Sequence, residues 1–296
     1  MIKTWLLETR PQFLILSIVL AILGTAIAFY DGFFNLGFAV IAFVGLLLTH
    51  ISVNTLNDYF DYKSGIDLNA QRTPFSGGSG ILPADKMRPK QVLWLGIISF
   101  ILAIPIGIYF CIVSGWLLLP LLVVAAICIL LYTSVILKTP YPEWAAGLGL
   151  GFLPVVGMYF VQSGVYNWHI VVAAIPSGIL VYNLLFLNEF PDLEADRQGK
   201  RKTFPVLLGL KAASIQYTVM TIVMYLWIIA WSIAGVMPIL SLISLLSIPF
   251  SIKAIKGALN YSDMNQLIPG MANNVLAIMV TQLLLAIAYI VSAFVF

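Results

Sequence analysis

The sequence predicts an all-α fold, an integral-membrane bundle of about nine transmembrane helices with two cytoplasmic acidic loops over a central cavity. First, hydrophobic residues make up 61% of the chain and charged residues only 9%, whereas a soluble domain carries about a quarter charged residues. Second, the hydrophobic residues form runs that are apolar on all sides, which indicates helices rather than the alternating strands of a barrel. Third, the Lys and Arg residues are confined to alternate connections between these runs.

A helix needs about 20 residues to cross a hydrocarbon core of about 30 Å. The connections between the runs are short, so we interpret residues 1–296 as a single transmembrane domain. The eighth run is the least regular, because Pro249 interrupts it. The expected spans lie near 12–30, 36–56, 91–113, 116–136, 144–163, 168–187, 212–234, 237–256 and 273–295.

The distribution of Lys and Arg predicts how the chain is oriented. If the N-terminus is cytoplasmic and nine spans follow, all 15 Lys and Arg residues fall on the cytoplasmic side. The opposite side then carries only Asp31 and His169 as ionisable residues. We therefore expect a multi-pass protein of the cell membrane, embedded in the lipid bilayer with its N-terminus in the cytoplasm. The net charge of +3 is explained by this orientation, and no nucleic-acid partner is expected.

Acidic residues gather in two clusters, each at the cytoplasmic end of an even-numbered span. The first cluster contains Asn57, Asp58 and Asp61, followed by Asp67. Asn54 and Asp58 share a helical face, and His50 lies one turn earlier on that stripe. The second cluster consists of Asn188, Asp192 and Asp196. A spacing of four residues places side chains on one face of a helix.

This arrangement predicts a magnesium site. Mg²⁺ takes oxygen ligands and usually relies on one or two carboxylates together with substrate phosphates. A simpler alternative is that these loops are acidic only because they are solvated, but two matched clusters on one side argue against it. The predicted metal ligands are Asn57, Asp61, Asn188, Asp192 and Asp196, and the predicted catalytic residues are Asp58, Asp61, Asp67, Asp192, Asp196 and Lys138.

Basic residues flank both clusters and could bind phosphate oxygens. They are Arg72, Lys86, Arg88, Lys138, Arg197, Lys200, Arg201 and Lys202. Of these, Arg72, Lys138, Arg197 and Lys200 are the predicted phosphate-binding residues. The loop Ser76-Gly77-Gly78-Ser79-Gly80 follows the first cluster, and glycines there allow backbone N–H groups to approach an anion. A lid, an anion-binding loop and a plain connection all remain open for this segment.

The motif Asn57-Asp58-x-x-Asp61 with Asn188-x-x-x-Asp192-x-x-x-Asp196 resembles the paired motifs of the UbiA superfamily of intramembrane prenyltransferases. The continuation Asp196-Arg197-Gln-Gly199-Lys200 and the stretch from Tyr132 to Lys138 are also similar to that family. The commoner family pattern has an acid at the position of Gly65, whereas this chain offers Asp67. That variant and the Ser-Gly-Gly-Ser-Gly loop resemble the dihydroxynaphthoate branch, which acts in menaquinone biosynthesis.

The resemblance implies Mg²⁺-dependent transfer of an isoprenyl group from a polyprenyl diphosphate to an aromatic acceptor, with dihydroxynaphthoate as the expected acceptor. The allylic C–O bond would ionise, and the acceptor would attack the carbocation within an apolar cavity. Prenylation of another lipid or quinone precursor is the alternative within the same chemistry. An ion-coupled transporter is the alternative from another class, but transporter sites lie near the middle of the membrane, where this sequence has no Asp, Glu, Lys or Arg.

Overall fold

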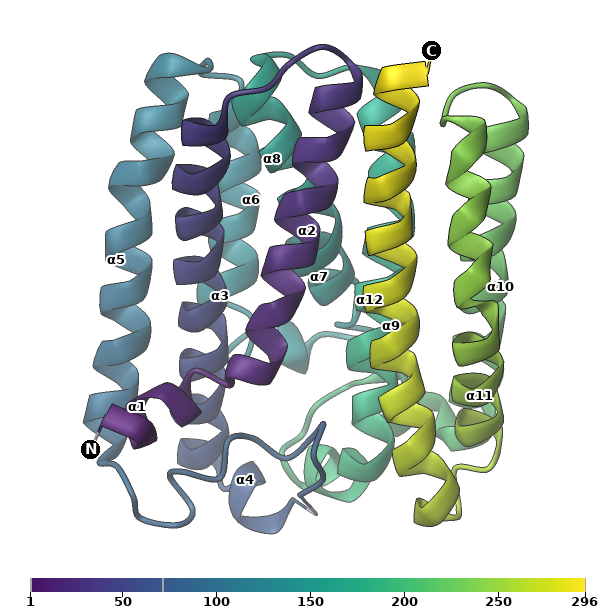
Figure 1. The fold of residues 1–296 in the computed structure, drawn as a ribbon. Coiled ribbons are helices and arrows are strands. Elements are labelled where there is room, and N and C mark those ends of the chain that lie inside the picture. The colour runs from purple at the N-terminus through teal and green to yellow at the C-terminus, as the bar shows by residue number, and fades with distance from the viewer. Residues whose placement is uncertain (1, 71, 296) are drawn as a thin grey trace.

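The computed structural model describes residues 2–70 and 72–295, and these residues form a bundle of helices without a β-strand. The two ends of the chain lie at opposite ends of the bundle (Figure 1). The expected all-α fold is therefore confirmed.

The helices follow one another with short connections. Short 3₁₀ segments occur at Ile136–Lys138 and Ile239–Ser247, and a π-helical segment at Gly147–Phe152 leads into α8. The α-helices are α1 (Ile2–Glu8), α2 (Pro11–Tyr30), α3 (Leu36–Ser64), α4 (Ile66–Asn69), α5 (Pro89–Val113), α6 (Leu118–Leu130), α7 (Trp144–Ala146), α8 (Leu153–Ser163), α9 (Trp168–Gln198), α10 (Phe204–Ile233), α11 (Ile248–Leu259) and α12 (Met264–Val295).

Eight helical segments of the described chain are long and apolar enough to cross a membrane, so the expected count of nine is not confirmed. The difference lies in α6, which has only 13 residues where a span at 116–136 was expected. The helix ends at Leu130, and the chain continues as irregular structure to the polar end of the bundle. There the N–H of Tyr141 donates to the carbonyl of Lys202 over 3.1 Å.

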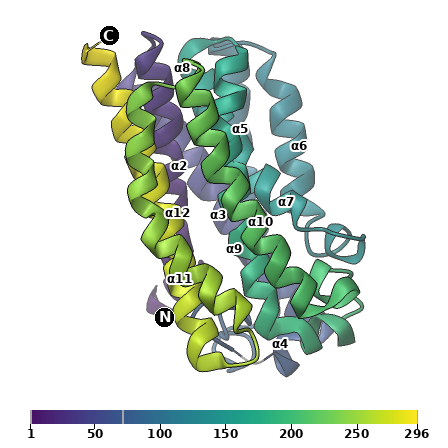
Figure 2. The ribbon, with the colours of Figure 1, turned by 90° about the vertical axis from the view of Figure 1, so that its right-hand side faces the viewer.

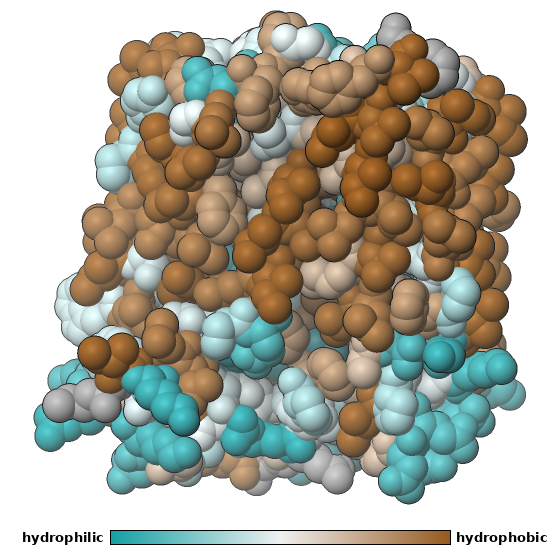
Figure 3. All heavy atoms as spheres, viewed as in Figure 1, coloured by the Kyte–Doolittle hydropathy of each residue, from teal (hydrophilic) through white to brown (hydrophobic). Residues whose placement is uncertain are grey.

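Two helices run past the ends of their apolar stretches and carry polar residues beyond them. Helix α3 continues to Ser64 and α9 to Gln198. Figure 3 shows hydrophilic residues gathered at the end of the bundle that carries α1 and α4, while hydrophobic side chains cover the flanks. This distribution is that of a multi-pass membrane protein.

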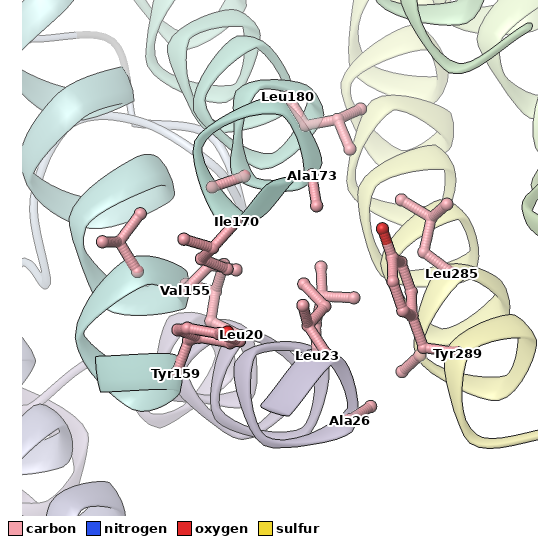
Figure 4. Close-up of a cluster of buried hydrophobic side chains, with 14 of the residues drawn as sticks. Leu20, Leu23, Ala26, Val155, Tyr159, Ile170, Ala173, Leu180, Leu285 and Tyr289 are labelled. Carbon is pink, nitrogen blue, oxygen red and sulfur yellow. The ribbon is translucent and has the colours of Figure 1, made fainter. Parts of the chain in front are cut away.

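The core of the bundle lies between α2, α8, α9 and α12 (Figure 4). Leu20, Tyr159, Ile170 and Leu285 come from these four helices and are fully buried. The helices α10 and α11 flank this core, and α6 and α7 lie on the other side of the bundle (Figure 2). The core thereby fixes α9, which carries the second acidic cluster.

Candidate active site

The first acidic cluster lies on the last two turns of α3. The helix ends at Gly65, whose φ of 83° is left-handed and suits glycine, so Asp67 falls on the short helix α4. Within α3, the side-chain N–H of Asn57 donates to Asp61 Oδ2 over 2.9 Å, as their spacing predicts. It also donates to Thr133 Oγ1 over 3.0 Å. Asn57 therefore holds Asp61 in place from one turn away.

The second cluster lies at the end of α9, and one arginine connects it to the first. After α9 the chain reverses at Lys200, which has a left-handed φ of 56°. This reversal lets Arg201 Nη1 donate to Asp196 Oδ1 over 2.8 Å, while Arg201 Nη2 pairs with Asp61 Oδ1. Burial would lower the pKa of Arg201, but the charges of Asp61 and Asp196 raise it above its ordinary value, so the guanidinium stays charged.

The N-terminal segment supplies a second buried cation. Arg10, in a left-handed conformation directly before α2, pairs with Asp58 Oδ1. Asp58 Oδ2 accepts the backbone N–H of Ser79 over 2.9 Å, and the Ser79 hydroxyl donates to Glu8 Oε2 over 2.8 Å. The N-terminal segment, α3 and the loop of residues 76–80, here called the glycine loop, thus meet at Asp58.

Two carboxyl groups in this region have raised pKa values. Burial raises the pKa of Glu8 to about 8, and the charge of Asp58 adds to the effect. Burial likewise raises the pKa of Asp67 to about 8, with Asp61 and then Asp58 contributing. Both groups therefore favour the neutral form near pH 7, first because they are buried and second because neighbouring carboxylates are negatively charged.

The glycine loop packs tightly on α4 and is closed by Arg72. The guanidinium donates to the carbonyls of Gly77 over 3.2 Å and Ser79 over 2.5 Å. Gly78 has a φ of 71°, and a Cβ there would lie 2.7 Å from Asp67 Oδ2. Gly78 is therefore required both by its left-handed backbone and by its close approach to Asp67.

A cavity begins beside these clusters and continues into the membrane-spanning part of the bundle. Along α3 its wall extends from Asn57 to Ala42, which corresponds to about 22 Å of helix. Its polar end is lined by Arg10, Asn54, Asn57, Tyr132 and Asn188. The deeper part is lined by apolar and small side chains, among them Gly45, Ile106, Phe110, Leu121, Gly157 and Val161.

The predicted acids and amides gather near this polar end. Asp61 and Asp196 share Arg201, Asn57 bonds to Asp61, and Asn188 lines the cavity. Asp192 lies beside the glycine loop, and its Oδ1 is buried without a hydrogen-bond partner. Asp58 and Asp67 lie on either side of Gly65 and face the loop.

The predicted basic residues are placed less centrally. Lys138 and Lys200 are exposed and form no ion pair with the described residues. Arg197 pairs at the surface with Glu194 over 2.8 Å. Arg72 is engaged with the carbonyls of its own loop. The structure thus brings none of these four cations into an ion pair with the acidic clusters.

Two cations do reach the carboxylates. Arg10 was not singled out from the sequence, and Arg201 was considered only as one of the basic residues that could bind phosphate oxygens. The positions of both arginines in the sequence could have indicated their role. Arg10 directly precedes the first span, and Arg201 follows Asp196 of the second cluster by five residues. Glu143 was also missed. It is buried, accepts the backbone N–H of Phe204, and has its pKa raised mainly by burial.

The site offers oxygen donors, which suit a hard divalent cation such as Mg²⁺. Among the described residues, no three His, Cys, Asp or Glu side chains are already arranged as a metal site. The two arginines pair with the carboxylates instead, and the unpartnered Asp192 Oδ1 remains available to a ligand. The donor set thus fits Mg²⁺.

Comparisons with known proteins agree with this picture. The sequence matches the UbiA prenyltransferase family over residues 10–266. It is 31% identical over 264 residues to 1,4-dihydroxy-2-naphthoate octaprenyltransferase of Bacillus subtilis, covering 88% of this chain and 84% of the relative.

Two solved structures show the same fold. A digeranylgeranylglyceryl phosphate synthase structure superposes with a TM-score of 0.66 at 18% identity, covering 98% of each chain. A UbiA homolog from Archaeoglobus fulgidus, bound to DMAPP and Mg²⁺, superposes with a TM-score of 0.61 at 14% identity. That alignment covers 97% of this chain and 99% of the other.

Proposed function

The chain belongs to the UbiA prenyltransferase family, and from this premise we propose that it transfers a polyprenyl group from its diphosphate to dihydroxynaphthoate with the help of Mg²⁺. It is a membrane prenyltransferase of the naphthoate branch, and its naphthoate relatives support an aromatic acceptor. The proposal adds the identity of the acceptor, the dependence on Mg²⁺, the residues of the site and the mechanism. The reaction would serve menaquinone biosynthesis.

One observation carries the proposal: two acidic clusters from helices far apart in the sequence meet at the polar end of a deep apolar cavity. A prenyl diphosphate has the same division, with an anionic head and a long apolar tail. The head would lie among Asn57, Asp61, Asn188, Asp192 and Asp196, and the tail would extend along α3 towards Phe110. The homolog from Archaeoglobus fulgidus with bound DMAPP and Mg²⁺ supports this assignment.

In the proposed mechanism, Asn57, Asp61, Asn188, Asp192 and Asp196 would hold Mg²⁺ against the diphosphate. When bound, the metal neutralises charge that develops on the departing diphosphate, an electrostatic contribution of several kcal/mol. Arg201 and Arg10 already lie beside these carboxylates and can turn to phosphate oxygens. Arg72, Lys138, Arg197 and Lys200 remain proposed diphosphate contacts, and each would have to move, because none of them pairs with the acidic clusters.

The remaining steps depend on the cavity. Ionisation of the allylic C–O bond leaves a carbocation that water would capture, so the apolar wall protects it by excluding water. The electron-rich ring of the acceptor then forms the new C–C bond, and the attacked ring carbon loses its proton, or its carboxyl group as CO₂, so that the ring becomes aromatic again. Asp58 and Asp67 lie on either side of the helix break at Gly65 and would hold the glycine loop in position beside the diphosphate. Asp58 does so through its hydrogen bond with Ser79, and Asp67 through its close contact with Gly78.

The naphthoate relative supports dihydroxynaphthoate as the acceptor. A glycerol-phosphate lipid is the second candidate, because the digeranylgeranylglyceryl phosphate synthase structure covers 98% of this chain. We further propose that residues 1–296 act as one domain in the cell membrane, with α1 and the acidic clusters on the cytoplasmic side. The confinement of the 15 Lys and Arg residues to one side supports this orientation.

The test is a product assay with the purified full-length protein. The protein receives a prenyl diphosphate and one acceptor at a time: dihydroxynaphthoate, 4-hydroxybenzoate or a glycerol-phosphate lipid. Mass spectrometry then identifies the products with Mg²⁺ and with EDTA. We expect a prenylated naphthoate product only with Mg²⁺. Transfer only to the glycerol-phosphate lipid would contradict the proposed acceptor, and equal transfer in EDTA would contradict the proposed metal dependence.

A further inference from the structure

His50 lies in the wall of the cavity, and no step of the proposed mechanism uses it. It is 2% exposed and lines the cavity together with Asn54 and Asn57 of the same helix. Seven residues separate His50 from Asn57, so the two share a face of α3 and lie about 10 Å apart along its axis. His50 therefore lies between the polar end of the cavity and its apolar interior.

The imidazole is held by a contact on one side only. Ser17 Oγ of α2 and His50 Nδ1 lie 2.8 Å apart, within hydrogen-bond distance. No described residue forms a hydrogen bond with the other ring nitrogen, Nε2. The ring orientation is thus fixed by Ser17, while Nε2 remains available for a ligand.

The other polar side chains of α3 that line the cavity already have partners. The Thr49 hydroxyl donates to the carbonyl of Leu46 over 2.8 Å, and the Asn54 amide donates to the carbonyl of Thr9 over 3.1 Å. A polar atom that gains no partner when a ligand displaces water from the cavity costs about 1–3 kcal/mol, and a prenyl tail offers no hydrogen-bonding group. The ligand that satisfies Nε2 must therefore carry a polar substituent.

We propose that His50 Nε2 binds a ring hydroxyl or carboxylate of the aromatic acceptor. This inference rests on the proposed function, because it assigns part of the same cavity to the second substrate. The acceptor ring would lie between His50 and the diphosphate at the polar end, with Ser17 keeping the imidazole turned towards it. His50 is then an acceptor-binding residue that orients the ring for attack.

A purely structural role makes a different prediction. In that case the Ser17–His50 contact only joins α2 to α3, and Nδ1 is the atom that matters. His50→Asn places an amide near the position of Nδ1 and removes the group at Nε2. His50→Gln places an amide near the position of Nε2. Ser17→Ala removes the interhelical contact and leaves both ring nitrogens.

The experiment measures steady-state kinetics and Tm for these three variants and the unmodified protein. We expect His50→Asn to raise the acceptor KM by about tenfold, the loss of roughly one hydrogen bond, with the prenyl diphosphate KM changed less than twofold. His50→Gln should recover most of the acceptor affinity. An acceptor analogue without the ring substituent should bind all of these proteins equally weakly.

Several outcomes would overturn the assignment. If His50→Asn keeps the acceptor KM, or if Ser17→Ala raises it as much as His50→Asn does, His50 serves only to pack α2 on α3. A rise in the prenyl diphosphate KM alone would place the donor beside His50 and would also refute the inference. If the unmodified protein prenylates no aromatic acceptor, the proposed function fails, and the assignment of His50 fails with it.

Discussion

Arg201 forms an ion pair with Asp61, a residue 140 positions earlier in the chain. The same guanidinium also binds Asp196 Oδ1 over 2.8 Å. The three side chains are nearly buried, with 12%, 8% and 2% of their surfaces exposed for Arg201, Asp61 and Asp196. One cation thus holds together the two carboxylate-bearing helices in the absence of other ligands.

We predict that Arg201→Gln lowers the stability of the ligand-free protein, because it leaves two buried carboxylates without their cation. Removing one partner of a buried ion pair usually lowers the free energy of unfolding by about 3–5 kcal/mol. Mg²⁺ should raise the Tm of this variant more than that of the unmodified protein, since it would replace the missing positive charge. Thermal unfolding in detergent, with and without Mg²⁺, measures both effects.

The matched control for Arg201 is Arg197→Gln, four residues earlier. Arg197 is 55% exposed and pairs with an exposed glutamate, so its loss should change the free energy of unfolding by less than about 1 kcal/mol. Equal losses of stability in the two variants would show that Arg201 does not hold the clusters together.

A second prediction concerns pH. The pKa of Glu8 is raised from 4.5 to about 8, so the folded protein binds a proton at Glu8 more tightly than the unfolded chain does. Between these two values, stability should therefore fall as pH rises, by up to about 1.4 kcal/mol per pH unit for each such group. Glu8→Gln should reduce this decline and raise Tm above that of the unmodified protein at pH 8.

The pH dependence of Tm in detergent at pH 5 to 8.5 tests the role of Glu8. Glu194→Gln, at an exposed position on the same side, is the control and should leave the slope unchanged. A Glu8→Gln variant with the slope of the unmodified protein would mean that Glu8 is ionised in the folded state.

A third prediction concerns the glycine loop. Gly78→Ala should raise the KM for prenyl diphosphate, because the new Cβ would lie 2.7 Å from Asp67 Oδ2 and displace the loop from α4. Gly235→Ala is the matched control, since Gly235 has a similar φ of 73° but no atom within 4 Å of the new Cβ. Both variants should share a backbone strain of about 1–2 kcal/mol, and only Gly78→Ala should alter substrate binding. Similar KM values in the two variants would show that the contact with Asp67 does not shape the site.

The fold was predictable from the sequence because membrane-spanning helices must be long and apolar on all sides. The expected count of nine spans is not confirmed at one place, where that relation fails. The apolar run at 116–136 continues past Leu130, but the helix does not. The chain leaves the helix there, and the backbone N–H groups of Val135 and Ile136 both donate to Leu131. Hydrophobicity alone does not predict that the backbone leaves the helical conformation after Leu130.

The candidate site was predictable in part. Spacings of four residues correctly placed Asn57 beside Asp61, because both lie on one helix. The partners of these acids come from other segments, and helical periodicity contains no information about them. Arg201 reaches Asp61 only because the chain reverses at Lys200, and Arg10 reaches Asp58 only because the N-terminal segment folds back on α3. Lys138 was expected at the site but is exposed at the end of a short 3₁₀ segment.

The central claim is that the two clusters act together on a prenyl diphosphate with Mg²⁺. The most direct measurement is the turnover of Asp61→Asn and Asp192→Asn, one variant from each cluster, at saturating substrates and Mg²⁺. Both should lose activity by at least a hundredfold while retaining a folded state, because each removes a carboxylate that the metal requires. The control is Asp85→Asn, at an exposed position of the same side, and it should stay within twofold of the unmodified protein. Turnover within threefold of the unmodified protein in either Asp61→Asn or Asp192→Asn would contradict the account.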